Sequence, residues 1–243
     1  MRALRHLQLS HTEHIVMVVM ARPSTTVCIA FLVHAAWSQP LPTLSGSQVA
    51  YLLGGPTQFV SFGVCTFNSC QQNSPYHPAT SFAPTATVDT DQWVSVAQSW
   101  GARSLCLTVH HTGGFALWPS AAHNYTIAQS PYQGGGGDIV RDFVESVRAA
   151  GLEPCFYIIP SWSDYVTRTQ PDISATAYLS IQLTMLSELL LNYGPIYRIW
   201  FDNYMLDTAV YQPYAVPGFT GAALTDTWAE IVGHVKCSRP TRS

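Results

Sequence analysis

A single carboxylate stands directly after a short apolar, aromatic segment. Asp202 follows the letters RIWF of residues 198–201, which indicate a buried strand. Burying a carboxylate at such a position is unfavourable unless it caps a helix or turn, or takes part in chemistry. The residue alone therefore leaves two interpretations, an N-cap at a strand–helix junction and a catalytic carboxylate.

Two adjacent histidines stand at the end of a second apolar segment. His110 ends the letters SLCLTVH of residues 104–110, and His111 follows them. Imidazole pairs bind metal ions, but no Asp, Glu or third His lies at ligand spacing here, so we expect no metal site. A loop histidine that is satisfied by backbone groups is the other interpretation.

The segments around these residues alternate between strand and helix patterns. We predict strands at Phe59–Phe67, Ser104–His110, Leu152–Pro160 and Ile196–Phe201, and helices at Thr90–Gly101, between Asp138 and Gly151, at Ala175–Tyr193 and at Thr225–Val235. Thr90 or Asp91 is expected to cap the first of these helices, and Asp138 the second. Continuous apolar strands that alternate with helices indicate parallel βα units, as in a small open sheet or half of a (β/α)8 barrel.

Ligands of both architectures bind at the carboxyl ends of the strands. Residues 65–72, 110–115, 157–164 and 202–204 follow those ends, and they are polar and aromatic with few charges. They suit a neutral, hydroxyl-rich ligand better than a phosphorylated one. The letters GGGGD lack the Lys and Ser or Thr of a P-loop, and no G-x-G-x-x-G follows the first strand, so a nucleotide fold is disfavoured.

Composition limits the classes of partner. The 243 residues are 47% hydrophobic and 10% charged, with a net charge of −3 and scattered Lys and Arg. The chain is long enough for one core, and nothing in it indicates a surface that binds nucleic acid. Its 7 Trp and 12 Tyr suit sugar stacking, although such rings also fill cores.

The N-terminus has the pattern of a targeting segment. The letters TTVCIAFLVHAAW form an apolar segment of signal-peptide length, preceded by Arg22 and with small residues at Ala36 and Ser38 near its end. The segment is too short for a stable membrane span. We therefore predict an N-terminal extension and signal peptide over residues 1–38, a folded domain over 39–243, and secretion or an endomembrane or lysosomal lumen as the location. The glycosylation sequon Asn124-Tyr125-Thr126 is usable in an exported chain.

Loss of the leader would leave an odd number of cysteines, namely Cys65, Cys70, Cys106, Cys155 and Cys237. At least one would then stay free or pair between chains. The first two are close enough to close a small loop. Cys106 and Cys155 lie within apolar segments and are expected as core thiols.

Four segments, taken in order, resemble the α-L-fucosidases of glycoside hydrolase family 29. They are YHPATSFAPTATVDTDQWVSVAQSWGA, SWGARSLCLTVHHTGGFALWPSAAHNYTI, GGDIVRDFVESVRAAGLEPCFY and YLSIQLTMLSELLLNYGPIYRIWFDN, within Phe59 to Asn203. The resemblance implies a (β/α)8 TIM barrel, of which 39–243 would supply only the first four βα units as a partial barrel glycosidase domain. It also implies retaining hydrolysis of α-L-fucosides without a cofactor.

The resemblance also implies a role for each matching residue. Asp202 is expected as the nucleophile, at the end of the fourth barrel strand. His111 corresponds to the first histidine of a pair that holds sugar hydroxyls, and His110 stands where the family usually has Lys. Trp118 corresponds to the tryptophan of a Leu-Trp-Pro segment at the rim of the site, and Tyr157 to a position that faces the sugar.

Several positions depart from the family pattern. They are Ser61 for a histidine, Gln71 and Gln72 for a Glu-Trp pair, and Thr112 and Gly113 for a second histidine and an aspartate. Each lost hydrogen bond to a sugar costs about 1 kcal/mol. The alternatives are therefore a catalytically inactive relative that binds sugar or is structural, and a different retaining glycosidase with the same nucleophile.

The family places its acid/base carboxyl group after the fourth βα unit. Glu153, Glu188 and Glu230 are poor substitutes, since each is predicted at a strand start or in a helix. We therefore expect that the acid/base is not present in this chain. The expected partner is a fucosylated oligosaccharide or glycoconjugate, without nucleic acid. Self-association of two half barrels is an alternative way to complete the fold.

Overall fold

The computed structural model describes residues 20–22, 25–27, 43–68, 70, 77–160, 163–202 and 229–235, and the chain divides into the units Met1–Leu53 and Gly54–Ser243. In the first unit, β1 (Met20–Arg22) pairs antiparallel with β2 (Thr25–Val27), and α1 spans Gly46–Leu53. The predicted boundary at residue 38 lies outside the described residues. No helix within the described part of the chain is long and apolar enough to cross a membrane.

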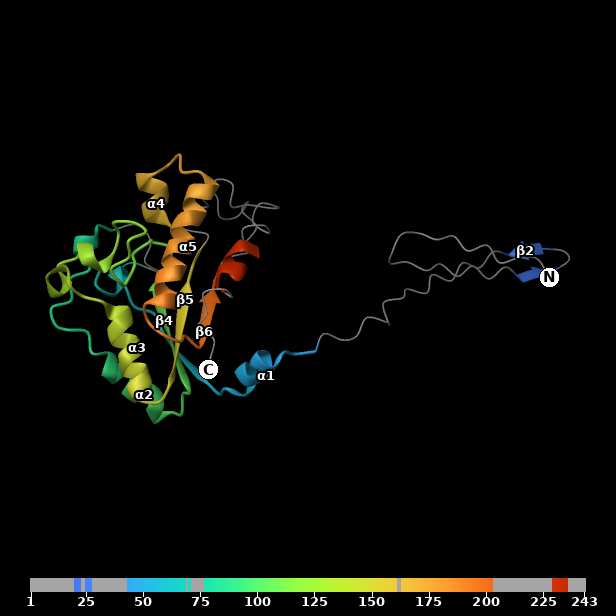
Figure 1. The fold of residues 1–243 in the computed structure, drawn as a ribbon, viewed down its shortest axis with the longest axis horizontal. Coiled ribbons are helices and arrows are strands. Elements are labelled where there is room, and N and C mark those ends of the chain that lie inside the picture. The colour runs from blue at the N-terminus through green and yellow to red at the C-terminus, as the bar shows by residue number, and fades with distance from the viewer. Residues whose placement is uncertain are drawn as a thin grey trace. The chain divides into compact units, whose positions relative to one another are not determined.

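The second unit is built on one parallel sheet (Figure 1). Its strands are β3 (Thr57–Val60), β4 (Ser104–His110), β5 (Glu153–Ile158) and β6 (Arg198–Phe201), adjacent in that order. Every neighbouring pair is parallel, so the prediction of parallel βα units is confirmed. Because all four strands point the same way, their carboxyl ends meet at one edge of the sheet.

Helices connect these strands and bury one face of the sheet. They are α2 (Thr90–Ser99), α3 (Ile139–Ala149) and α5 (Ala175–Leu191), with the short α4 (Asp164–Thr169) directly after β5. Leu105 and Leu107 of β4 pack in the same core as Phe143 of α3 and Leu186 of α5. Val109 belongs to this core as well, whereas Cys106 belongs to a separate cluster. Because side chains alternate between the two faces of a strand, Cys106 lies on the second face.

The second face carries a smaller cluster and the polar residues of the strand ends. Cys106, Cys155, Tyr157 and Ile159 are buried together, with Phe59 of β3 against them. On β6 the same alternation places Arg198, Trp200 and Asp202 on this face, and Trp200 is 46% exposed. Asp202 and Tyr157 therefore share the face of the sheet opposite to α3 and α5.

Two local predictions are wrong. The predicted strand Phe59–Phe67 ends at Val60, because the chain then turns into the 3-10 helix η2 (Val64–Thr66), where the Gly63 N–H donates to Thr66 Oγ1 at 3.1 Å. The cap of α2 is Asp89, whose carboxylate accepts from the Gln92 N–H at 2.9 Å. The cap predicted for α3 is confirmed at Asp138.

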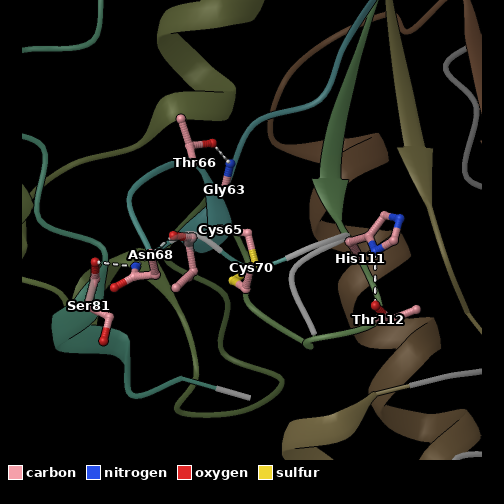
Figure 2. The surroundings of a disulfide bond; sticks show 9 residues. Gly63, Cys65, Thr66, Asn68, Cys70, Ser81, His111 and Thr112 are labelled. Carbon is pink, nitrogen blue, oxygen red and sulfur yellow. Dashed lines mark hydrogen bonds between the residues drawn. A yellow bond between two sulfur atoms is a disulfide. The ribbon is translucent and has the colours of Figure 1, made fainter. Parts of the chain in front are cut away.

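The described cysteines form two disulfides. Cys65 and Cys70 close the small loop after η2, as predicted, and Figure 2 shows this bond close to the turn with His111. Cys106 and Cys155 are also bonded, so the prediction of free core thiols is wrong. They are register partners on the adjacent strands β4 and β5, and their Cα atoms are 4.2 Å apart.

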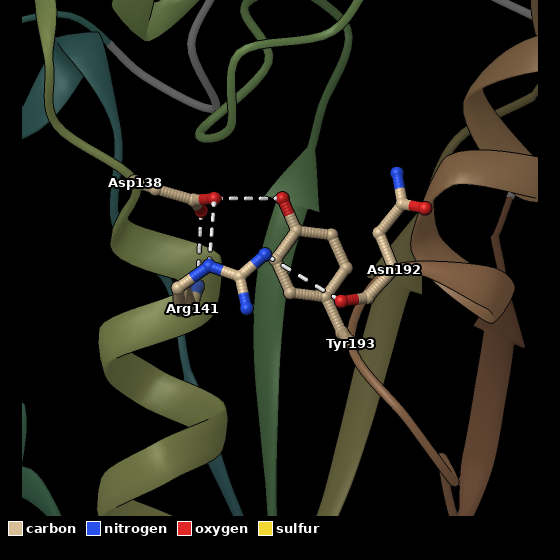
Figure 3. A network of polar contacts seen from close by, with 4 residues as sticks. All are labelled: Asp138, Arg141, Asn192 and Tyr193. Carbon is tan, nitrogen blue, oxygen red and sulfur yellow. Dashed lines mark hydrogen bonds and ion pairs between the residues drawn. The ribbon is translucent and has the colours of Figure 1, made fainter.

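A polar network fixes the segment that leads into β6 (Figure 3). Asp138 caps α3 by accepting from the Arg141 N–H at 3.0 Å, and it also accepts from the Tyr193 hydroxyl at 2.9 Å. The Arg141 guanidinium lies over the Tyr193 ring, 5.0 Å from its centroid, and donates to the Asn192 carbonyl. Burial raises the pKa of Asp138, while the hydrogen bonds from Arg141 and Tyr193 oppose that shift. The start of α3 and the end of α5 are thereby tied together.

Residues 229–235 are helical and fall within the predicted helix Thr225–Val235. His234 of this segment is hydrogen-bonded to Ser187 of α5, with Nε2 and Oγ 2.7 Å apart. Ile231 is buried in the core that the sheet and helices share. The last described helix therefore packs on the same side of the sheet as α5.

Candidate active site

Asp202 lies at the carboxyl end of β6. Its backbone N–H donates to the Ile158 carbonyl at 3.1 Å, which extends the β5–β6 pairing by one residue. Its carboxylate Oδ2 accepts a hydrogen bond from the Tyr157 hydroxyl. Asp202 is therefore held to β5 twice, through its backbone N–H and through its carboxylate.

Aromatic rings surround Tyr157 on several sides. His111 stacks on it with ring centroids 5.6 Å apart and an interplanar angle of 10°, while Phe59 and Trp200 meet it edge-on at 5.3 and 5.8 Å. Burial raises the pKa of the Tyr157 hydroxyl, and the hydrogen bond and charge of Asp202 raise it further. Tyr157 consequently stays protonated and keeps donating to the carboxylate.

His111 lies between this ring cluster and the loop that follows β3. Its Nδ1 is hydrogen-bonded to Thr112 Oγ1, 3.0 Å away. Figure 2 shows both residues in the surroundings of the Cys65–Cys70 disulfide. That loop is itself tied down, because Asn68 Nδ2 donates to the Ser81 carbonyl at 3.0 Å. His111 thus lies in the turn after β4 and close to the loop after β3.

The turn after β4 is anchored on α4, an element that sequence analysis missed. The Asp164 N–H donates to the Thr112 carbonyl at 2.8 Å. Gly114 has a φ of +89°, and a Cβ there would lie 2.3 Å from Ser163 Oγ, so the close approach requires glycine. Asp164 is a buried carboxylate at this edge. The Ser163 side chain, which caps α4 by accepting from the Val166 N–H, is the sequence signal that could have revealed it.

His110 is buried and is not exposed at the surface of the site. Burial, and then His123 and His111, lower its pKa to about 3, while the Ile159 backbone weakly favours the charged form. Neither of its ring nitrogens makes a hydrogen bond of normal geometry. His123, whose ring centroid is 6.4 Å away, also has a lowered pKa of about 4 because it is buried. Both imidazoles are neutral at physiological pH, unlike the lysine for which His110 stands.

Trp118 is packed against a carboxylate. Its indole is 1% exposed, and its Nε1–H donates to Glu188 Oε2 at 2.8 Å. The Ser120 hydroxyl and the Ala121 N–H donate to the same carboxylate at 2.6 and 2.8 Å. Glu188 of α5 therefore holds the loop after β4, and Trp118 belongs to that contact.

Three of the five predicted site residues are in direct contact, namely Asp202, Tyr157 and His111. His110 lies behind them, and Trp118 lies in the packed loop. Of the positions that depart from the family pattern, Ser61 is exposed and Thr112 is buried, while Gln71 and Gln72 lie outside the described residues. Among the described residues, no group of three His, Cys, Asp or Glu is placed to hold a metal ion.

A carboxylate at the carboxyl end of a parallel strand lies where the active sites of TIM-barrel enzymes are found. The family described as Alpha-L-fucosidase matches residues 56–231. The chain therefore belongs to the α-L-fucosidase family, which the match covers over most of its length.

Comparison with individual proteins agrees with this assignment. Alpha-L-fucosidase 1 of Arabidopsis thaliana is 31% identical over 163 residues, which cover 67% of this chain and 31% of that protein. A protein of Oryza sativa subsp. japonica, provisionally named alpha-L-fucosidase 1, is 36% identical over 168 residues, or 68% of this chain and 31% of that protein. This chain thus spans about a third of the length of these relatives.

A solved structure extends the likeness to the fold. A glycoside hydrolase 29 family member from an unknown rumen bacterium matches with a TM-score of 0.67 and 26% identity, over 82% of this chain and 35% of that one. The four parallel strands are thus part of a TIM-barrel type of α/β fold, as the sequence predicts.

Proposed function

We propose that this chain carries the first part of the catalytic domain of a retaining glycosidase that releases α-L-fucose from fucosylated oligosaccharides or glycoconjugates. Asp202 is the nucleophile. The observation that carries this proposal is the hydrogen bond from Tyr157 to Asp202 at the end of β6, because it holds one carboxylate oxygen and orients the carboxylate.

The reaction begins when an oxygen of Asp202 attacks the anomeric carbon of the fucoside. The bond from that carbon to the leaving oxygen breaks, and the leaving oxygen takes the electron pair and a proton from a second carboxyl group. Water then hydrolyses the glycosyl ester and restores the Asp202 carboxylate. Tyr157 stays protonated throughout, so it positions the nucleophile without competing for the transferred proton.

Of the remaining predicted site residues, one is suited to bind the sugar and two support the surrounding structure. His111 stacks on Tyr157 beside the nucleophile and is suited to hold a sugar hydroxyl. His110 is buried and uncharged, so we assign it to the floor beneath His111. Trp118, through its contact with Glu188, supports the loop at the rim.

The acid/base is not assigned to a described glutamate. Glu188 already accepts three hydrogen bonds, and Glu153 lies at the start of β5, the opposite end of the sheet from Asp202. Since the chain spans about a third of its relatives, the nucleophile is best tested with a reagent that needs no acid. In 2-deoxy-2-fluoro-α-L-fucosyl fluoride, fluoride leaves unaided and the fluorine at C2 slows hydrolysis of the ester.

Mass spectrometry of the full chain after reaction with this reagent tests the nucleophile. We expect one fluorofucosyl group on the peptide that contains Asp202 and no label in Asp202→Asn. Asp172→Asn, which changes an exposed carboxylate, is the matched control and should label normally. Labelling that survives Asp202→Asn, or that falls on another carboxylate, would show that Asp202 is not the nucleophile.

A second candidate function is sugar binding without catalysis. Ser61, exposed just after β3, and Thr112, buried after β4, replace imidazoles of the family pattern and motivate this alternative. Calorimetric titration with fucose distinguishes the two. If the chain binds fucose but is not labelled by the fluorinated fucosyl fluoride, the result supports a sugar-binding protein without catalysis. Labelling of the chain excludes that alternative. A panel of activated aryl glycosides separates a fucosidase from another retaining glycosidase.

We also propose entry into the secretory pathway, with residues 1–38 removed as a leader. The two disulfides of the described residues, Cys65–Cys70 and Cys106–Cys155, favour an oxidising compartment. N-terminal sequencing of the secreted protein tests the leader, and a mature chain that begins before Arg22 would contradict it.

A further inference from the structure

The loop between β4 and α3 presents an asparagine that the proposed chemistry does not use. Asn124 is exposed and begins Asn124-Tyr125-Thr126, the only N-x-S/T sequon with a residue other than proline at its centre in the sequence. Its two partners in the sequon are both buried. The acceptor amide therefore faces solvent while the rest of the sequon belongs to the core.

Backbone and ring contacts hold the residues on the C-terminal side of Asn124. The Tyr125 carbonyl accepts from the Ala116 N–H at 3.0 Å, and the Ile127 N–H donates to the Ala116 carbonyl at 3.0 Å. The Tyr125 ring stacks on Tyr165 with centroids 4.9 Å apart. A large group on Asn124 would extend away from these contacts, so the fold tolerates it.

We propose that Asn124 carries an N-linked glycan, a modification that rests on the proposed entry into the secretory lumen. A new bond joins Asn124 Nδ2 to the first sugar of a lipid diphosphate-linked oligosaccharide. The bond between that sugar and the diphosphate breaks, the diphosphate leaves with the electron pair, and the amide loses a proton to the transferase.

The same geometry fixes when the glycan is attached. Thr126 is 2% exposed, so its hydroxyl, the third element of the sequon, is inaccessible once the loop has folded. The transferase must therefore act before Tyr125 and Thr126 pack. Attachment takes place during synthesis, and the folded chain is not a substrate.

Cell-free translation with endoplasmic-reticulum microsomes tests the glycan at Asn124 together with entry into the lumen. The full chain, alone and with an added cleavable signal peptide, is assayed for protease protection and for a mass shift that an N-glycan endoglycosidase removes. We expect a shift for the protected chain, none for Asn124→Gln, and a normal shift for Asn192→Gln, an exposed asparagine outside the sequon.

The outcomes separate this proposal from the proposed secretion. A chain that is protected but never shifted overturns the glycan and leaves secretion standing. If only the chain with the added signal peptide is protected and shifted, the glycan site stands and the native leader fails. Folded, unglycosylated protein offered to solubilised transferase should stay unmodified while its urea-unfolded form is modified, and modification of the folded form would overturn the timing.

Discussion

The buried histidines His110 and His123 make the stability of this fold sensitive to acid. Their pKa values, about 3 and about 4, lie below the unfolded value of 6.5. Below pH 6.5 these histidines bind protons in the unfolded chain but not in the folded chain. Their contribution to the free energy of unfolding is therefore fully present above about pH 6.5 and is lost as the pH falls. Between pH 7 and pH 5 each histidine lowers the free energy of unfolding by about 2 kcal/mol, together about 4 kcal/mol.

Two carboxyl groups contribute with the opposite sign. Burial raises the pKa of Asp138 and of Asp142, so protonation of these carboxyl groups favours the folded state as the pH falls. The charge of His111 is already one of the causes that lower the pKa of His110. Since a domain is stable by only about 5–15 kcal/mol, the predicted loss is a large fraction of the total.

Urea unfolding followed by circular dichroism at pH 7 and pH 5 measures this loss. Comparing the two pH values within one variant cancels the packing cost of the substitution. We expect His110→Met to shrink the pH difference by about 2 kcal/mol, and a further change at His123 to remove most of the rest. Leu189→Ala, a buried substitution without a titrating group, should lose stability equally at both pH values. An unchanged pH difference in the double histidine variant would refute the reasoning.

Three further predictions concern the site and its supports. Tyr157→Phe removes the hydrogen-bond donor to the proposed nucleophile, so labelling by the fluorinated fucosyl fluoride should slow about tenfold. The melting temperature of the variant should stay normal. An unchanged labelling rate would exclude a positioning role for Tyr157. Gly114→Ala places a Cβ 2.3 Å from Ser163 Oγ at a positive φ, so it should lower the free energy of unfolding in urea by about 1–3 kcal/mol. Gly101→Ala also has a positive φ, but its Cβ would meet open space, so only the backbone strain should lower the free energy of unfolding. Tyr193→Phe leaves Asp138 with one fewer donor and should cost about 1 kcal/mol by the same assay; no loss would mean that the network in Figure 3 is not stabilising.

Some secondary-structure elements could be predicted from the sequence because the residues within them determine their structure. The strand Ser104–His110 matches β4 to the residue, because its residues before His110 are apolar or small, and all seven residues are buried. Asp138 was identified as a cap from its place before an amphipathic segment. Phe59–Phe67 failed because Gly63 and the following 3-10 turn interrupt an apolar segment whose composition alone suggests a continuous strand.

Contacts across strands could not be predicted in this way. Cys106 and Cys155 appear in the sequence as separate apolar thiols, and only the β4–β5 register makes them neighbours. The hydrogen bond from Tyr157 to Asp202 likewise requires β5 and β6 to be parallel and in one register, which is a property of the assembled sheet. The sequence therefore predicts Asp202 and Tyr157 as separate site residues, but it does not predict the hydrogen bond that joins them.

Under the proposed mechanism, the residues that cleave the bond and the positions that depart from the family pattern follow different strands. Asp202 and Tyr157 come from β6 and β5, whereas the positions that depart from the family pattern, such as Ser61 and Thr112, follow β3 and β4. Loss of groups that bind hydroxyls in ground and transition state alike weakens affinity without removing the nucleophile. We therefore expect slow labelling at low reagent concentration that approaches an ordinary rate at saturation. A maximal rate that stays negligible at saturation would instead place the defect in the Asp202–Tyr157 pair.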